Sequence, residues 1–161
     1  MGDPWVLIFF YMIQSLLMVL AGLEFFNIKY KLKEIILPVL IFGFTIWLVR
    51  FLYVYCQIPF GSHTFVLFVL FCIILRLFFK TKVYIILTIA LLDFILIMLG
   101  ACAGGYIIHF IKIDMSITLN STLLHVLFGH TENIFLVMLF AVTKIFKVNM
   151  FTIMERIERD G

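Results

Sequence analysis

About five apolar runs alternate with short polar segments along the 161 residues of the chain. The runs cover residues 5–26, 35–55, 64–79, 83–108 and 123–146, and a shorter version of the last one starts near Thr131. An α-helix rises about 1.5 Å per residue, so roughly 20 apolar residues cross the hydrocarbon core of a bilayer. The pattern predicts an all-α, polytopic integral membrane protein, with about five transmembrane helices in residues 1–147 and a separate tail at 148–161.

The composition supports the membrane class. Hydrophobic residues make up 65% of the chain, charged residues make up 13%, and the mean hydropathy is +1.24. A soluble domain of this size cannot hide so much apolar surface from water. The first run has no basic start and no small-residue cleavage site, so we expect a retained helix rather than a signal peptide. Cys56, Cys72 and Cys102 form no C-x-x-C pair, which argues against a thiol-disulfide oxidoreductase.

Positive charge is found in every second loop. Three lysines lie in residues 27–34, two in 80–82, and two lysines and two arginines in 144–159. The segment before the first run and the loop at 57–63 have none, and the loop at 112–122 has only Lys112. Lysine and arginine are retained on the cytoplasmic side of bacterial membranes. We therefore expect a multi-pass protein of the bacterial inner (plasma) membrane, with its amino terminus outside and its carboxyl terminus in the cytoplasm.

The longest run, at 83–108, contains one carboxylate, Asp93, near its middle. A carboxylate at that depth is costly unless it is neutralised or paired, so Asp93 is expected to face other helices rather than lipid. Farther along, Gly100 and Gly104 form a small-xxx-small surface, which allows another helix to approach closely. The glycine-rich segment around them is better explained by helix packing than by phosphate binding.

Two further charged residues lie well inside the apolar runs, away from their ends, namely Arg50 in the second and Glu132 in the fifth. Counting residues from the predicted cytoplasmic ends puts Asp93 and Glu132 at similar heights, and the long Arg50 side chain can reach both. An ion pair between Arg50 and either carboxylate would reduce the cost of each charge in lipid. Arg50, Asp93 and Glu132 are thus the predicted buried polar core. Two interpretations stay open, a structural pair between helices and a polar pocket that binds a ligand or a proton.

Histidines are expected mainly at the outer boundary of the bilayer, namely His63, His125 and His130. His125 and Glu132 share one helix face, but a zinc or di-iron site would need ligands from other helices as well. A haem would need two inward histidines at similar depth. No metal and no cofactor is therefore expected. The chain also contains no catalytic triad, zinc-protease or phosphate-loop motif and no basic nucleic-acid patch, so neither enzymatic activity nor a nucleic-acid partner is expected.

The tail has a different pattern from the rest of the chain. Met150, Ile153, Met154 and Ile157 recur at helical spacing, and charged residues lie on the other side. This pattern predicts an amphipathic helix. It lies either on the membrane surface or in line with the fifth span, and in the second case one continuous helix from about 123 to 157 is expected to carry movement to a partner.

Several short motifs resemble a known family. They are the lysine-rich first loop, RFLY at 50–53, PFGSHT at 59–64, and LHVLFG at 124–129 followed by Glu132. Together they look like the membrane sensor region of Firmicute histidine kinases of the peptide-quorum and sporulation type. The resemblance implies a two-component system in which the last membrane helix leads to a dimerisation and ATP-binding region. This chain has no phosphoacceptor or ATP-binding motif, so we expect either a sensor fragment or a stand-alone relative with a separate partner.

The function expected from these observations is sensing or signal transduction without catalysis, with the lipid bilayer and a second copy or a cytoplasmic signalling protein as partners. The alternatives are a small transporter, or a transporter subunit, in which Asp93 and Glu132 bind a cation or proton, and a purely structural assembly partner. Five helices do not divide into two equal repeats, which counts against the transporter.

Overall fold

Residues 4–58, 61–112 and 121–150 are described by a computed structural model, and all the regular structure in them is helical. The predicted all-α class is therefore confirmed. The first apolar run forms α1 (Pro4–Val6), the π-helix η1 (Leu7–Tyr11) and α2 (Met12–Phe25). The next three form α3 (Leu32–Tyr55), α4 (Ser62–Phe78) and α5 (Val83–Phe110). The last forms α7 (Thr122–Gly129), the 3-10 helix η2 (His130–Asn133) and α8 (Ile134–Phe146).

Four of these segments are long and apolar enough to cross a membrane. They are Pro4–Phe25, Leu32–Tyr55, Val83–Phe110 and Thr122–Phe146, with 22 to 28 residues each. The remaining helix, α4, has 17 residues and is shorter. Large apolar side chains stay exposed along all of them, as a lipid solvent requires. The chain thus has four to five apolar helices of membrane-protein type.

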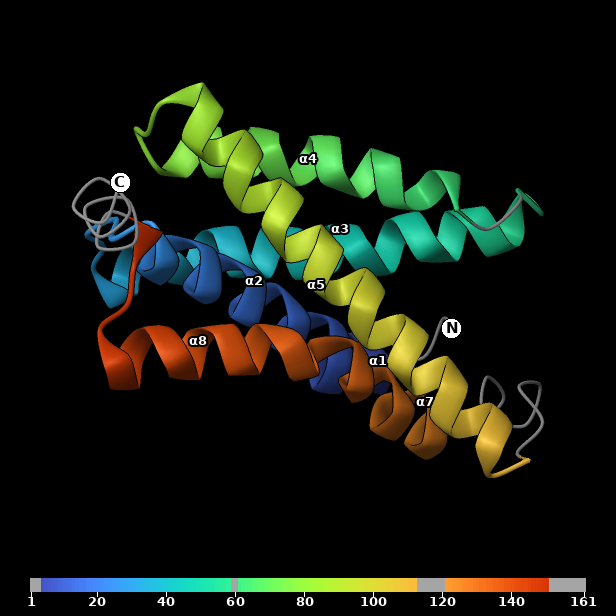
Figure 1. Cartoon of the computed structure of the whole chain (residues 1–161). Coiled ribbons are helices and arrows are strands. Elements are labelled where there is room, and N and C mark those ends of the chain that lie inside the picture. Colours follow the sequence, from blue (N-terminus) through green and yellow to red (C-terminus); the bar gives the residue numbers. More distant parts are fainter. Residues whose placement is uncertain (1–3, 59–60, 113–120, 151–161) are drawn as a thin grey trace.

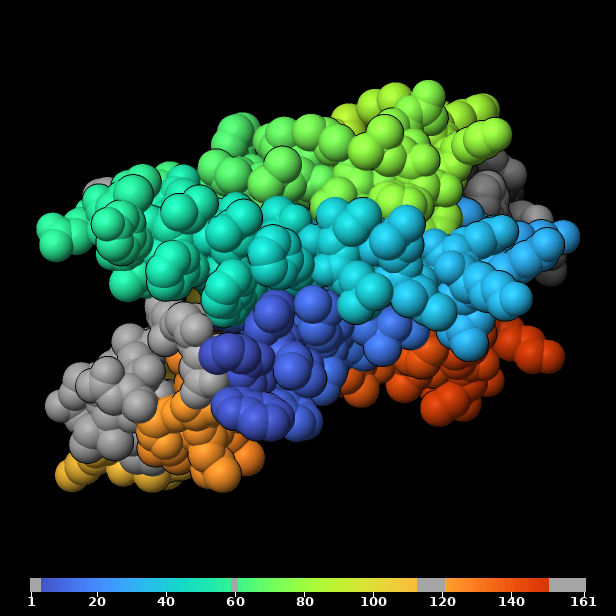
Figure 2. All heavy atoms as spheres, turned by 180° about the vertical axis from the view of Figure 1, so that it is seen from behind, coloured from blue at the N-terminus to red at the C-terminus, as the bar shows by residue number. Residues whose placement is uncertain are grey.

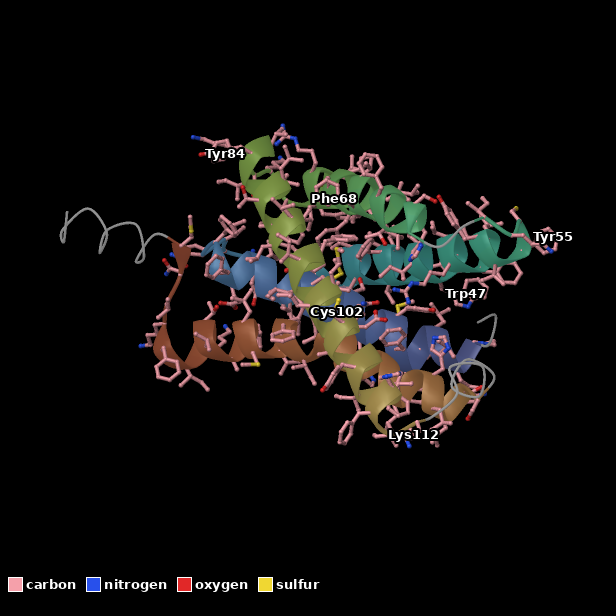
Figure 3. The ribbon with its side chains drawn as sticks, turned by 45° about the vertical axis from the view of Figure 1, so that its right-hand side comes forward. Trp47, Tyr55, Phe68, Tyr84, Cys102 and Lys112 are labelled. Atoms are coloured by element: carbon pink, nitrogen blue, oxygen red, sulfur yellow. The ribbon has the colours of Figure 1, made fainter. Side chains whose placement is uncertain are left out.

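Consecutive helices run in opposite directions, and α5 crosses the others at an angle (Figure 1). Tyr84 and Lys112 lie near the two ends of this tilted helix (Figure 3). The α2–α3 connection, the α4–α5 connection and the end of α8 lie at the same end of the bundle (Figure 1), so the lysines of these segments are brought together there. This end is called the lysine end below.

The most buried span is the first one, because α2 packs against α3, α5 and α8. From behind, α3 and α4 lie along one side of the first span and the fifth span lies along the other (Figure 2). Ser15 belongs to this core, where its hydroxyl donates to the Val39 backbone oxygen at 2.9 Å. The polar interruptions of the first apolar run therefore face protein rather than lipid.

Four of the described helices are followed by a residue in the left-handed conformation that is not glycine. Asn27, Gln57, Lys112 and Lys147 all have φ between 51° and 58°, and they follow the ends of α2, α3, α5 and α8. After α2, the Ile28 N–H donates to the Leu23 oxygen at 2.9 Å, which closes the helix end in the manner of a Schellman motif.

The fifth span is bent rather than straight. It starts at Thr122, not near Thr131, and its α-helical bonding is interrupted at His130–Asn133. The Thr131 hydroxyl donates to the Phe128 backbone oxygen at 2.6 Å, and polar side chains that compete for backbone groups in this way favour a bend. Of the two alternatives for the tail, the one with a continuous helix from about 123 to 157 is therefore wrong, because α8 ends at Phe146 and Lys147 takes the left-handed conformation.

Most of the predicted tail lies outside the described residues. This applies to Ile153, Met154 and Ile157 of the apolar stripe and to the charged residues after them. Met150 is described and packs against the hydrophobic core.

Candidate functional site

An ion pair joins the second span to the bend of the fifth. Arg50 Nη2 lies 3.5 Å from Glu132 Oε2, and the two side chains are 17% and 22% exposed. Gln14 Nε2 of α2 donates to the same carboxylate oxygen at 3.3 Å. The carboxylate therefore ties three helical segments together, and its charge has both a counter-charge and a hydrogen-bond donor.

Aromatic rings of the first span support the guanidinium. Its central carbon lies 5.2 Å from the ring centre of Tyr11 and 6.0 Å from that of Phe10, which are distances for cation–π attraction. Both rings come from η1, whose wider turn places two consecutive aromatic residues in the core, and both are fully buried. Phe10 also lies edge-on to His130, at 5.8 Å between ring centres.

A cavity of about 240 Å³ lies beside the Arg50–Glu132 pair, between α2, α3, α4 and α5. Its lining combines five polar residues with apolar ones. The polar residues are Gln14, Arg50, His63, Thr64 and Glu132, and the apolar ones are Met18, Phe42, Ile46, Leu67, Phe94, Ile97, Met98 and Ala101. Among the described residues, Gln14 Oε1 and Arg50 Nε have no hydrogen-bond partner although both atoms are buried. The cavity is therefore lined by a charged pair and other polar side chains on an apolar background, a combination that suits a small amphipathic molecule.

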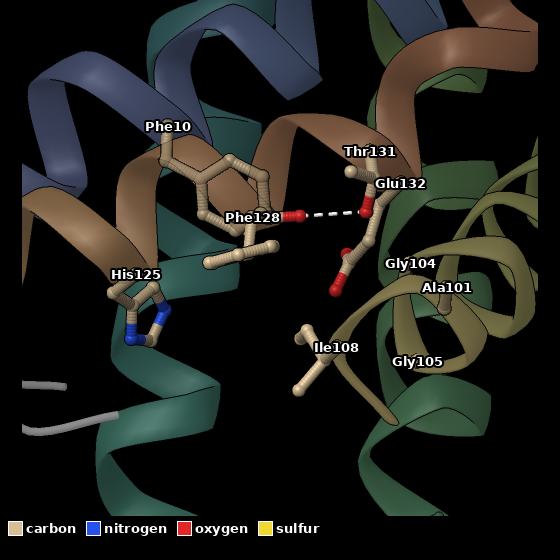
Figure 4. Close-up of a pocket in the computed structure, with 10 residues that line it drawn as sticks. Phe10, Ala101, Gly104, Gly105, Ile108, His125, Phe128, Thr131 and Glu132 are labelled. Carbon is tan, nitrogen blue, oxygen red and sulfur yellow. Dashed lines mark hydrogen bonds between the residues drawn. The ribbon is translucent and has the colours of Figure 1, made fainter. Parts of the chain in front are cut away.

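A second cavity, of about 170 Å³, lies on the other side of Glu132, between α5 and α7. Its lining includes Phe10, His125, Phe128 and Ile108, and Glu132 and Ala101 line both cavities. Figure 4 shows these side chains around the bend, with the Thr131–Phe128 hydrogen bond at its edge. A change in the position of Glu132 would therefore alter the lining of both cavities.

The small residues of α5 hold the bend. A Cβ added at Gly100 would lie 2.7 Å from the Thr131 backbone oxygen and closer still to that of Glu132. A Cβ at Gly104 would overlap the Thr131 hydroxyl. The predicted close approach at Gly100 and Gly104 is thus made to η2, to backbone atoms at Gly100 and to the Thr131 side chain at Gly104.

Asp93 does not join the Arg50–Glu132 pair. Its side chain is 0% exposed, and neither carboxylate oxygen has a hydrogen-bond partner among the described residues. It faces α2, where a Cβ added at Gly22 would lie 3.3 Å from Asp93 Oδ2. The three residues predicted as one polar core are thus placed at two separate positions.

The histidines differ in environment. His63 lines the larger cavity, and its Nδ1 accepts from the Gly61 N–H at 3.3 Å. His125 is buried at 7% exposure, and His130 Nδ1 lies 3.3 Å from Asn133 Nδ2. Within residues 4–58, 61–112 and 121–150, no group of three or more histidine, cysteine or acidic side chains is arranged to hold a metal.

A second polar cluster lies at the lysine end. Lys144 Nζ of α8 lies 2.5 Å from Glu24 Oε1 of α2, and the Tyr30 hydroxyl donates to the same oxygen. Burial, together with the neighbouring Glu24 carboxylate, raises the pKa of Tyr30 to about 12. Glu24 therefore ties the end of α8 to α2 and to the loop before α3.

Gln14, Tyr11 and Phe10 belong to the site but were not predicted from the sequence. The signal that pointed to one of them was the Gln14–Ser15 interruption in an otherwise apolar run, because a polar side chain at that depth needs a partner. Nothing in the sequence separates Phe10 and Tyr11 from the many other aromatic residues.

Comparisons of the chain with models of known protein families, with curated proteins and with solved structures found no match.

Proposed function

We propose that this chain is a sensory domain of a bacterial inner membrane. In this proposal, a small ligand binds in the larger cavity and moves the bend of the fifth span, and α8 passes the movement to a cytoplasmic partner. One observation supports it most strongly, namely that Glu132 both lines the cavity and belongs to the bend. A 3-10 segment within an α-helix often marks a hinge, and this one is held by an ion pair that a ligand can replace.

The proposed orientation has the amino terminus outside and the carboxyl terminus in the cytoplasm. It rests on the positive charge of the lysine end, since lysine-rich loops are retained inside. The ligand cavity would then lie in the outer half, because Arg50 is near the end of α3 and His63 near the start of α4, and these helix ends lie away from the lysine end (Figure 1).

Reporter fusions test this orientation. Fusions after Lys33, Lys82 and Lys147 are expected to be active in a cytoplasmic reporter, and fusions after Ser62 and Lys112 in a periplasmic one, because the loops alternate in positive charge. A periplasmic signal after Lys82 would contradict both the orientation and the five-span topology.

Distance measurements test the hinge. Spin labels at Leu127 of α7 and Ile145 of α8, which are both exposed, report on the angle between the two helices. The labels are separated by 18 residues of the bent span, about 27 Å of helix, in a background that lacks the native cysteines. Glu132→Gln is expected to shift or broaden the distance distribution, because the amide cannot keep the charge attraction of Arg50.

Glu34→Gln is the matched control. Glu34 accepts only from the Lys31 N–H at the exposed start of α3, among the interactions described, and lies far from the bend. An unchanged distribution in Glu132→Gln would contradict the hinge.

The alternative, a small transporter, is supported by the buried Asp93, and it predicts proton or cation flux in proteoliposomes that Asp93→Asn abolishes.

A further inference from the structure

Asp93 lies where α5 is in close contact with α2 at Gly22. A Cβ at Gly22 would overlap Ile89 Cγ2, so the two helices can pack this closely only because Gly22 has no side chain. Asp93 is on the same face of α5 as Ile89, one turn farther along, and Ala90 beside them is also fully buried. The carboxyl group is therefore enclosed by apolar atoms and by the backbone of α2.

No charged side chain in the described part of the chain is paired with this carboxyl group. The ionisable side chains on the segments around α5 are engaged with other groups or lie in other places. Two ion pairs account for four of them, Glu24 of α2 with Lys144 of α8 and Glu132 of η2 with Arg50 of α3. On α4, Arg76 donates to the Thr81 backbone oxygen, and Cys72 faces a groove between α4 and α5. His125 and His130 lie around Phe10. An ionised Asp93 would have neither a counter-charge nor a hydrogen-bond donor, which is the costly state of a buried acid.

A route to water lies close by. Gly22 is three residues from the end of α2, only about 5 Å along the helix axis. A polar cavity of about 280 Å³ opens at that end, lined by Glu24, Asn27, Thr143, Lys144, Lys147 and Asn149. The described lining of this cavity includes no residue of α5, so a path from Asp93 to it requires α5 to move away from α2.

We propose that Asp93 is a proton-binding site, which holds a proton while α5 is packed against Gly22 and releases it toward the lysine end when the two helices separate. The same helix carries Gly100 and Gly104, which hold the bend of the fifth span. Proton binding would therefore stabilise the position of α5 that keeps the bend in place. Protonation would then be a second signal to the domain, besides the proposed ligand.

Infrared spectroscopy of the full chain in lipid at neutral pH tests the proposal, because the carbonyl of a carboxylic acid absorbs apart from the bands of a carboxylate. Subtracting the spectrum of Asp93→Asn from that of the wild type is expected to leave an acid carbonyl band. Glu132→Gln is the control, and its subtraction is expected to leave carboxylate bands, because Glu132 is paired with Arg50. Carboxylate bands from Asp93 would overturn the proposal.

A second measurement needs no substitution, in case Asp93→Asn does not fold. Wild-type protein grown with carbon-13 aspartate is expected to show its acid carbonyl band shifted to lower frequency. The sequence has four aspartates, and Asp93 lies within a described helix, whereas Asp3, Asp114 and Asp160 lie outside the apolar runs of the sequence. An acid band that does not shift, or no acid band at all, would overturn the proposal.

Discussion

Replacing Arg50 with alanine is expected to lower the free energy of unfolding by about 2 kcal/mol. Removing one member of a buried ion pair costs roughly 3–5 kcal/mol, and the partial exposure of this pair reduces the effect. The loss arises mainly because Glu132 keeps its charge and is left with Gln14 as its hydrogen-bond donor. Unfolding by steric trapping in bicelles would measure the difference.

The double variant identifies the partner. Arg50→Ala combined with Glu132→Gln is expected to recover part of the loss, because the uncompensated charge is removed. Arg50→Ala combined with Asp93→Asn is the matched comparison, and it is expected to recover nothing, since Asp93 does not contact Arg50. Equal recovery in the two double variants would contradict the assignment of the pair.

Gly100→Ala is expected to have the other large effect. The added methyl group would overlap the backbone oxygens of Thr131 and Glu132, and backbone atoms of a packed helix cannot rotate away as a side chain can. Overpacking of this kind costs typically about 1–3 kcal/mol. We expect a loss at the upper end of that range, and a change in the distance between labels on α7 and α8, because α5 and the bend must separate.

Gly105→Ala is the control on the same helix. A Cβ at Gly105 would meet no atom within 4 Å, so the substitution is expected to be neutral or to stabilise by up to about 1 kcal/mol through helix propensity. A loss in Gly105→Ala as large as that in Gly100→Ala would show that the glycines matter through the helix itself rather than through the bend.

The apolar runs of the sequence predicted the helices well, because a span must bury about 20 consecutive residues in lipid whatever its neighbours are. The helix ends were harder to place, since Asn27, Gln57, Lys112 and Lys147 take the left-handed conformation in which glycine is normally expected. The bend at His130–Asn133 was not predicted at all. It depends on contact with Gly100 and Gly104, which lie in another helix and far away in the sequence.

The partner of Arg50 could not be chosen from the sequence for a related reason. Counting residues from the helix ends treats all spans as parallel, and it places Asp93 and Glu132 at similar heights. The tilt of α5 breaks this assumption, because Asp93 is ten residues beyond Val83 and still lies beside Gly22, three residues from the end of α2. Tilt is set by packing against neighbours, and a single span does not specify it.

The 17 residues of α4 give it a length of about 25 Å, which is shorter than the hydrocarbon core of about 30 Å. In the proposed five-span topology, the lipid beside α4 would have to thin locally, or the flanking residues would have to reach farther to the headgroups, and both responses cost energy. A change in bilayer thickness would thus change the energetic cost of placing α4 across the bilayer. Because Thr64 and Leu67 of this helix line the cavity of about 240 Å³ beside Arg50, lipid chain length and the proposed ligand would act on the same cavity lining.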